Sequence, residues 1–198
     1  MEVAVIKLGV GNTASVLFAL ERLGARGVLT DDPAQIAGAE RVILPGVGAA
    51  GHAMHKLRAS GADEALRAFP RPLLGICLGQ QLLYQRSEEG AAEGLGLLAG
   101  DVTALATSRE LPAPHMGWSA VRAERAHPLL AGVASGDYFY FVHSYVCPVD
   151  AQTIAIANYG RSFAAVSGAG NVFGCQFHPE RSGAPGARVL QNFLALPC

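Results

Sequence analysis

The chain has 198 residues, 51% of them hydrophobic and 16% charged, and a formal net charge of −1. This composition excludes a disordered chain, because enough apolar side chains are present to form a packed core. It also excludes a strongly basic surface, so neither nucleic acid nor an anionic membrane is an expected partner. Glu2 is an acid where a secretion signal has basic residues, and Lys7 interrupts the first apolar run. No stretch is apolar enough to span a membrane. We therefore expect a cytoplasmic protein.

Cysteine and histidine spacing gives no sign of a metal centre. The four cysteines contain no Cys-x-x-Cys pair, which is typical of reduced thiols in the cytosol. His52 and His55 are three residues apart, but no third ligand follows at a suitable distance along the chain. We interpret them as surface residues of a helix and expect neither metal nor cofactor.

The first half of the chain alternates strand and helix patterns. Apolar runs predict strands over residues 3–8, 27–30, 41–44 and 72–76. Helix patterns follow these runs: a helix capped by Asn12 or Thr13 and ending at Gly24, a short helix from Pro33, one reaching about Arg58, and one over residues 78–86. Such alternation is typical of a parallel sheet that has helices on both faces.

The second half reads as short strands joined by turns. Strands are expected over residues 101–106, 118–122, 138–142, 153–157, 161–166 and 171–177, and a helix over 184–196. These strands should extend the sheet edge in antiparallel fashion or form a small second sheet. No repeat or linker divides the chain. The fold class expected is α/β, a single domain over residues 1–198 with a mainly parallel central sheet.

The segment Gly75-Ile76-Cys77-Leu78-Gly79 lies between the most apolar strand and a helix. This order is typical of a nucleophile elbow, with Cys in place of Ser, in which the flanking glycines permit a tight turn. A helix N-terminus favours a thiolate at Cys77 and leaves the N–H of Leu78 free. Taken alone, the segment is better explained as a small buried cysteine in a glycine-punctuated strand.

A second segment, Phe177-His178-Pro179-Glu180, changes that balance. Residues two apart in an extended segment face the same side, so Glu180 should reach the ring of His178. Pro179 restricts His178 to an extended backbone. A carboxylate on one ring nitrogen leaves the other free to take a thiol proton, which is the Cys–His–acid arrangement of acyl transfer. A histidine beside a glutamate is common at surfaces, and only the combination with Cys77 is specific.

The turn Pro45-Gly46-Val47-Gly48 follows a predicted strand. Its backbone N–H groups can face a developing oxyanion. A phosphate loop is the alternative, but the Lys-Ser/Thr ending of such a loop is missing.

Together these segments resemble the triad-type, class I glutamine amidotransferases, and the resemblance covers nearly the whole chain. The motifs Pro45-Gly46-Val47-Gly48, Gly75-Ile76-Cys77-Leu78-Gly79-Gln80-Gln81 and Gln176-Phe177-His178-Pro179-Glu180 carry it. Two further segments, Gly94-Leu95-Gly96-Leu97 and Pro114-His115-Met116-Gly117-Trp118, resemble one branch of that family, the glutaminase subunits of imidazole glycerol phosphate synthase in histidine biosynthesis.

The resemblance implies a role for each matching residue. Cys77 would attack L-glutamine and hold a γ-glutamyl thioester, His178 would move the proton, and Glu180 would orient His178. The oxyanion would lie between the Leu78 N–H and the Val47–Gly48 turn. Substrate contacts are implied for Gln81, Glu89, His143, Ser144 and Tyr145. A cyclase partner with a (β/α)8 barrel, or the gate for ammonia passage, is implied at Asn12, Met116, Trp118, Tyr140 and Arg181.

Several residues depart from the family pattern, and alternatives remain. Lys7 and Leu8 replace an acid and an aromatic residue, Ser119 replaces an asparagine, and Arg181 replaces a lysine. These positions belong to the implied partner-facing side, so partner identity stays open. Met116 and Trp118 fit core packing equally well by pattern alone. Two other functions remain: a related amidotransferase that feeds another synthase, such as one of amino-sugar synthesis, and a catalytically silent scaffold.

Overall fold

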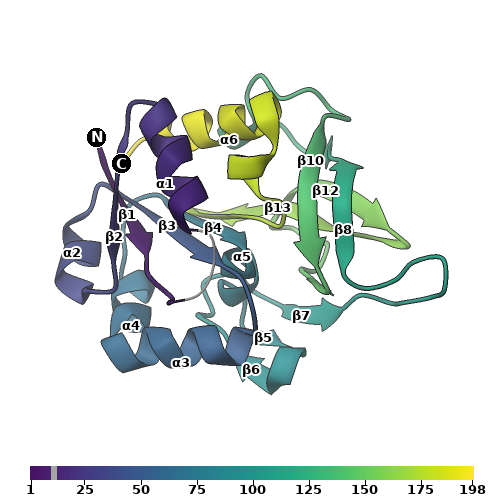
Figure 1. The fold of residues 1–198 in the computed structure, drawn as a ribbon, viewed down its shortest axis with the longest axis horizontal. Helices are drawn as coiled ribbons and strands as arrows, with labels where there is room; N and C mark the ends of the chain where they lie inside the picture. Colours follow the sequence, from purple (N-terminus) through teal and green to yellow (C-terminus); the bar gives the residue numbers. More distant parts are fainter. Residues whose placement is uncertain (10–12) are drawn as a thin grey trace.

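A computed structural model describes residues 1–9 and 13–198. In this part of the chain the largest sheet has eight strands in the order β2-β1-β3-β4-β14-β13-β12-β9 (Figure 1). From β2 to β14 the neighbours pair in parallel, and from β14 to β9 they pair antiparallel. The strands are β1 (Glu2–Ile6), β2 (Arg26–Thr30), β3 (Arg41–Gly46), β4 (Leu73–Cys77), β9 (Arg122–Ala123), β12 (Thr153–Tyr159), β13 (Arg161–Ala169) and β14 (Val172–Cys175).

Two smaller sheets accompany the large one. A two-stranded antiparallel ribbon joins β8 (His115–Ala120) to β10 (Tyr138–His143). The other sheet has the order β11-β7-β5-β6, formed by β5 (Arg86–Ser87), β6 (Ala92–Glu93), β7 (Asp101–Ala104) and β11 (Tyr145–Val146). The second half of the chain therefore does both things that the sequence allowed, extending the sheet edge and forming additional small sheets. The expected α/β fold class is confirmed.

Helices cover both faces of the large sheet, because its inner strands are apolar on both sides. Val3 and Val5 of β1 belong to one hydrophobic cluster, whereas Ala4 and Ile6 belong to the other. The first cluster includes side chains of α1 (Thr13–Arg22) and α6 (Gly183–Ala195), which lie on the same face (Figure 1). The second includes α2 (Pro33–Gly38), α3 (Ala50–Ser60), α4 (Ala62–Arg67) and α5 (Leu78–Leu82). Three 3₁₀ turns complete the elements: η1 (Glu89–Ala91), η2 (Pro128–Leu130) and η3 (Pro179–Arg181).

Two helix predictions need correction. The helix expected over residues 78–86 ends at Leu82, because the following segment is recruited into sheet-like pairing: the Gln85 N–H donates to the Gly100 carbonyl at 3.1 Å. Helix α4 was not expected. It begins directly after Gly61, whose φ of +75° ends α3 and turns the chain.

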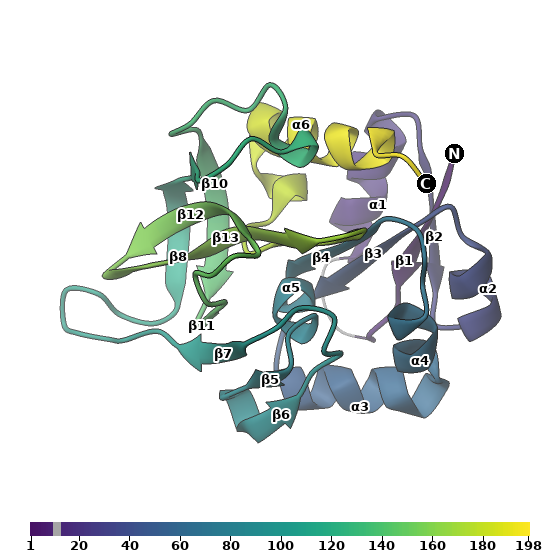
Figure 2. The same ribbon diagram turned by 180° about the vertical axis from the view of Figure 1, so that it is seen from behind.

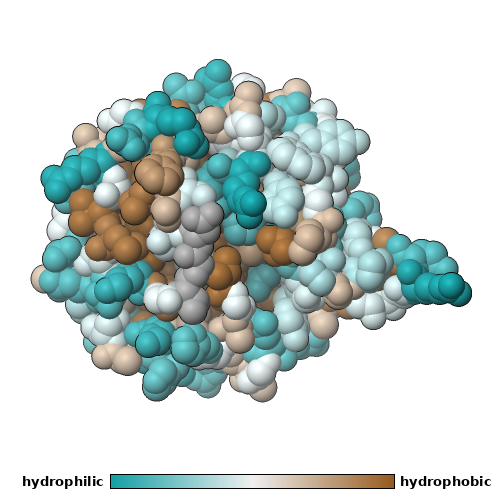
Figure 3. All heavy atoms as spheres, in the orientation of Figure 1, coloured by the Kyte–Doolittle hydropathy of each residue, from teal (hydrophilic) through white to brown (hydrophobic). Residues whose placement is uncertain are grey.

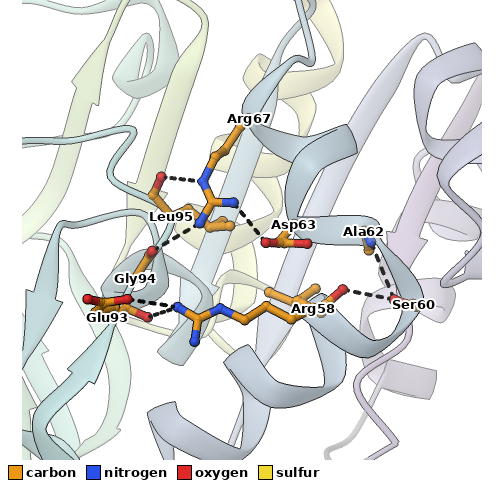
Figure 4. Close-up of polar contacts among 9 residues, drawn as sticks. Arg58, Ser60, Ala62, Asp63, Arg67, Glu93, Gly94 and Leu95 are labelled. Atoms are coloured by element: carbon orange, nitrogen blue, oxygen red, sulfur yellow. Dashed lines mark hydrogen bonds and ion pairs between the residues drawn. The ribbon is translucent and has the colours of Figure 1, made fainter.

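Polar contacts fasten the α3–α4 corner to the segment after β6 (Figure 4). The guanidinium of Arg67 donates to the carbonyl of Leu95 at 3.0 Å and to the carboxylate of Asp63 at 2.8 Å. Gly94 lies so close to the end of α5 that a Cβ there would stand 2.1 Å from the Tyr84 carbonyl oxygen. This anchoring fixes the segment against the helix that follows Cys77.

The connection between β7 and β8 projects from the body of the molecule in both ribbon views (Figures 1 and 2), and its tip is hydrophilic in Figure 3. Tyr159 ties this arm to the sheet, because its hydroxyl donates to the Pro112 carbonyl at 2.7 Å. Within residues 1–9 and 13–198, none of the helices has the length and apolar character needed to cross a membrane.

Candidate active site

Cys77 lies at the junction of β4 and α5 in a strained backbone conformation. Its φ of 56° and ψ of −113° are unusual for a residue with a side chain. The flanking glycines are needed for close approach: a Cβ on Gly79 would stand 1.7 Å from the Leu44 carbonyl oxygen, and one on Gly75 would stand 2.5 Å from the Gly79 carbonyl oxygen. The sequence thus produces the sharp strand-to-helix turn of a nucleophile elbow.

Cys77 is 5% exposed, and its thiol faces polar groups of β10 and of the residue after β14. Its Sγ lies 3.6 Å from the Val142 carbonyl oxygen. The amide Nε2 of Gln176, a fully buried residue directly after β14, donates toward Sγ at 3.8 Å. Gln176 belongs to a motif that the sequence singled out, but its contact with the thiol was not expected.

His178 and Glu180 form a buried pair. Nδ1 of His178 lies 2.8 Å from Oε1 of Glu180, and the two side chains are 9% and 4% exposed. This contact confirms the expectation that Glu180 reaches the His178 ring, but the expected extended backbone through both residues is wrong. The 3₁₀ turn η3 brings the two side chains together. The His178 N–H donates to the Tyr140 carbonyl at 2.9 Å, which holds the turn against β10.

The charge state of His178 follows from its neighbours. Burial alone would lower its pKa, but contacts with Cys77 and Glu180 outweigh burial and raise the pKa to about 10. At neutral pH the ring is therefore an imidazolium beside the thiol. Its Nε2 is buried beside the Cys77 thiol and makes no hydrogen bond of normal geometry among the described residues. This orphaned donor suits a group that gives a proton to a substrate atom.

A cavity of about 340 Å³ opens beside the thiol. It is lined by Cys77, Pro114 and Val142 and by all eight residues assigned to oxyanion and substrate binding: Val47, Gly48, Leu78, Gln81, Glu89, His143, Ser144 and Tyr145. Pro114 and Val142 were not among the expected site residues.

Two polar side chains of this cavity are already engaged by the protein. Nε2 of Gln81 donates to the Tyr145 carbonyl and to Oε1 of Gln176, both at 3.0 Å. Oε2 of Glu89 accepts from the Ala50 N–H at 2.8 Å, at the first residue of α3. Glu89 therefore fastens the start of the helix that follows the Val47–Gly48 turn.

The turn at Val47 separates two cavities. Val47 and Val142 line both the cavity beside the thiol and a smaller one of about 90 Å³, which is also lined by His178, Glu180 and Arg181. Gly48 has a φ of +87°, a conformation that favours glycine. Position 46 must be glycine for another reason, since a Cβ there would stand 2.9 Å from the Leu78 Cβ.

Four of the five residues assigned to a partner surface gather at the β8–β10 ribbon. Met116 and Trp118 are 64% and 54% exposed, so the alternative that they pack in the core is wrong. The Trp118 ring meets the Tyr140 ring edge-on at 6.0 Å, and the Arg181 guanidinium lies 5.1 Å from the centre of the Tyr140 ring. The fifth residue, Asn12, lies outside the described residues.

The remaining histidine and cysteine candidates do not line the cavity beside Cys77. His52 and His55 are exposed on α3. Among the described residues, no group of three or more His, Cys, Asp or Glu side chains is arranged to hold a metal ion. Cys147 and Cys175 are free and buried, and burial raises the pKa of each thiol well above its usual value.

Fold and geometry together define an α/β protein with a cysteine at a nucleophile elbow and a histidine–glutamate pair beside it. The family model for glutamine amidotransferase class-I matches residues 5–196. A crystal structure of a glutamine amidotransferase shares this fold with a TM-score of 0.75, at 21% identity and with 98% of this chain and 97% of that chain covered.

Curated relatives narrow the identification. The chain is 50% identical over 195 residues to the imidazole glycerol phosphate synthase subunit HisH of Xanthomonas axonopodis pv. citri (strain 306). It is 46% identical over 200 residues to the subunit of the same name from Vibrio cholerae serotype O1. Both alignments cover 98% of this chain and 98% of the relative. The chain belongs to the class-I glutamine amidotransferases and, within them, to the HisH family.

Proposed function

We propose that this chain is the glutaminase subunit of imidazole glycerol phosphate synthase, a single amidotransferase domain over residues 1–198. It hydrolyses L-glutamine to glutamate and ammonia and passes the ammonia to a cyclase subunit, which makes imidazole glycerol phosphate and AICAR in histidine biosynthesis. The observation that carries the proposal is the strained Cys77 elbow beside the buried His178–Glu180 pair. The relatives' shared name supports the pathway. A catalytically silent scaffold has no need for such an arrangement.

The reaction proceeds in two steps. The Cys77 thiolate attacks the amide carbon of the glutamine side chain, and the C–N bond breaks after His178 gives its Nε2 proton to the departing ammonia. A γ-glutamyl thioester remains on Cys77. Neutral His178 then takes a proton from water, the resulting hydroxide attacks the thioester carbonyl, and glutamate leaves as the thiolate is restored. Glu180 holds Nδ1 of His178 throughout and stabilises the imidazolium.

Backbone N–H groups stabilise the negative oxygen that forms in both steps. Leu78 is the first residue of α5, and the first N–H groups of a helix have no partner within it. The second donor comes from the Val47–Gly48 turn, whose glycines allow a peptide to reorient at low cost. Removal of one such donor typically lowers the rate about 10²- to 10³-fold, so a turn that points its N–H elsewhere holds the enzyme nearly inactive.

The cavity beside Cys77 accommodates the charged end of glutamine. The Glu89 carboxylate suits the α-ammonium group, and the backbone of residues 143–145 suits the α-carboxylate. Gln81 completes the contacts, because it lines the cavity and its side chain is held by the Tyr145 carbonyl and by Gln176.

Ammonia leaves on the other side of Val47, through the smaller cavity lined by His178 and Arg181. The (β/α)8-barrel cyclase binds the exposed face of the β8–β10 ribbon with Met116, Trp118 and Tyr140, beside Arg181 of η3. Asn12 is assigned to the same interface. Free thiols at all four cysteines suit a cytoplasmic protein.

The test is glutamate release at saturating glutamine by the chain alone, with the cyclase, and with the cyclase and its nucleotide ligand. We expect a very low rate for the chain alone and an increase of orders of magnitude in the full mixture, because partner docking shifts the Val47–Gly48 turn toward its competent orientation. Equal rates in all three conditions would exclude regulated coupling and favour a free-standing amidase.

A further inference from the structure

Two buried histidines outside the Cys–His–Glu arrangement form a continuous hydrogen-bond chain. Nδ1 of His115 lies 2.9 Å from Nε2 of His143, across the β8–β10 ribbon where these two residues pair directly. Nε2 of His115 lies 2.8 Å from the Ser119 hydroxyl, and Nδ1 of His143 lies 2.9 Å from the Tyr145 carbonyl oxygen. His115 is 3% exposed and His143 is 6% exposed.

The direction of every hydrogen bond in this series follows from the group at its end, the Tyr145 carbonyl. The Tyr145 carbonyl only accepts, so Nδ1 of His143 carries a proton. Burial lowers the pKa of His143 to about 3, with smaller contributions from His115 and His178, so its Nε2 is bare and accepts from Nδ1–H of His115. Burial also lowers the pKa of His115, so its Nε2 accepts from the Ser119 hydroxyl.

Packing holds the first ring of the chain in place. His115 is stacked between Phe141 and Tyr159, with ring centroids 5.1 Å and 4.2 Å away and interplanar angles of 22° and 20°. An aromatic ring in this position therefore keeps its packing partners even when its nitrogens are replaced by carbon. This separates the polar role of His115 from its packing role.

The hydrogen-bond chain of His115 and His143 ends at the wall of the substrate cavity. The Tyr145 carbonyl accepts from both His143 and Gln81, which fills both of its acceptor positions. The neighbouring Ser144 carbonyl accepts from the Leu105 N–H at 2.9 Å. The peptides of this wall are thus oriented by the protein before any substrate binds.

We propose that His115 is a positioning residue for glutamine binding: its Nδ1–H fixes the His143 ring, which fixes the Tyr145 peptide in the cavity wall. The inference rests on the proposed function, because glutamine is taken as the substrate. His115 does not line the cavity and acts only through His143. Because this wall contacts the unreactive end of glutamine, its loss weakens binding without slowing the chemical step.

The test uses His115→Phe, which keeps the stacked ring and leaves Nε2 of His143 without its donor. We measure the Kd of glutamine by calorimetry in the Cys77→Ala background, and KM and kcat in the active chain with the cyclase and its ligand. We expect Kd and KM to rise about tenfold, and kcat to change less than threefold. This rise corresponds to the lower end of the free-energy loss that follows when a buried acceptor is left unpaired. His115→Asn, whose amide restores a donor near the Nδ1 position, should recover most of the affinity.

The matched control is His127→Phe. His127 is a partly buried histidine that accepts from the Leu129 N–H at 3.1 Å, away from the cavity. This variant should lose stability and keep the KM for glutamine. Unchanged KM in His115→Phe, or a fall in kcat at constant KM, would overturn the inference. Glutamine hydrolysis by Cys77→Ala would instead overturn the proposed function.

If His115→Phe fails to fold, a measurement on the unsubstituted protein tests the same inference. Imidazole ¹⁵N spectra between pH 6 and 8 should show His115 and His143 neutral and protonated on Nδ1. Protonation of His143 on Nε2 would reverse the direction of the hydrogen bond between His115 and His143 and overturn the inference.

Discussion

Glu180→Gln is the substitution that most sharply tests how the buried pair controls the charge of His178. The amide keeps the shape of the carboxylate and can still accept from Nδ1 of His178, now 2.8 Å from Oε1. The negative charge is lost from a side chain that is 4% exposed. Water screens so buried a charge poorly, so its removal should have a large effect on the imidazolium.

The size of the effect follows from the separation of the charges. Two unit charges about 4 Å apart interact by about 4 kcal/mol near a protein surface, and the amide's hydrogen bond retains part of this. A loss of about 3 kcal/mol lowers the pKa of His178, which is about 10 in the unsubstituted chain, by roughly two, to about 8 or slightly below. The proton that departing ammonia needs is then lost within the ordinary assay range.

The assay is kcat/KM for glutamate release between pH 6 and 10, with the cyclase and its ligand present. The ratio between the unsubstituted protein and Glu180→Gln should widen roughly tenfold between pH 7 and pH 9. The same ratio at every pH would refute the reasoning. Glu124→Gln is the control, since Glu124 pairs with Arg122 at the surface and should leave the profile unchanged.

The same pKa makes a prediction for stability. Because the pKa of folded His178 lies above the unfolded value of about 6.5, its contribution to the free energy of unfolding is complete below pH 6.5 and is lost as pH rises through about 10. In Glu180→Gln the contribution should be smaller and its loss should be complete by about pH 8. Urea unfolding at pH 6, 8 and 10 measures it.

Two further predictions concern the elbow. A glutamine-analogue electrophile should modify Cys77 and spare Cys147 and Cys175, whose buried thiols have raised pKa values; intact and peptide mass spectrometry detects the label. Gly79→Ala should lower the melting temperature strongly and abolish activity, because the new Cβ would stand 1.7 Å from the Leu44 carbonyl oxygen.

Each of these predictions has a control in the same chain. Iodoacetamide, which needs no substrate-like binding, should modify the exposed Cys198 thiol, and equal labelling of Cys175 by the glutamine analogue would contradict the assignment of Cys77. Gly51→Ala places a Cβ in open space on α3 and should raise helix stability by up to about 1 kcal/mol. Equal melting temperatures for the two alanine variants would contradict the account of the elbow.

The strand-to-helix order of the first half could be predicted from the sequence, because both faces of the parallel strands are covered and the runs are therefore continuously apolar. The elbow at Cys77 followed from its two glycines, although the reason for them is the close approach of neighbouring backbone and not φ at the glycines themselves. The short strands β5, β6 and β11 could not be predicted, because two-residue strands are defined by their partners and carry no pattern of their own.

The site was less accessible to sequence reasoning where it depends on long-range register. The His115–His143 contact joins residues 28 positions apart and exists only because these two residues pair across the ribbon. Gln176 stands beside the His178 motif in the sequence, but its approach to the Cys77 thiol depends on β14 lying next to β4. The His178–Glu180 contact was foreseen from spacing alone, although a 3₁₀ turn and not a strand produces it.

Cys77→Ala tests the central claim most directly. The variant is assayed with the cyclase and its nucleotide ligand, supplied either with glutamine or with an ammonium salt, and formation of imidazole glycerol phosphate is measured. We expect glutamine-dependent turnover to fall by several orders of magnitude while ammonium-dependent turnover stays close to that of the unsubstituted complex, because the thiolate is the nucleophile and the partner performs the cyclisation. Near-normal glutamine use by Cys77→Ala would contradict the account.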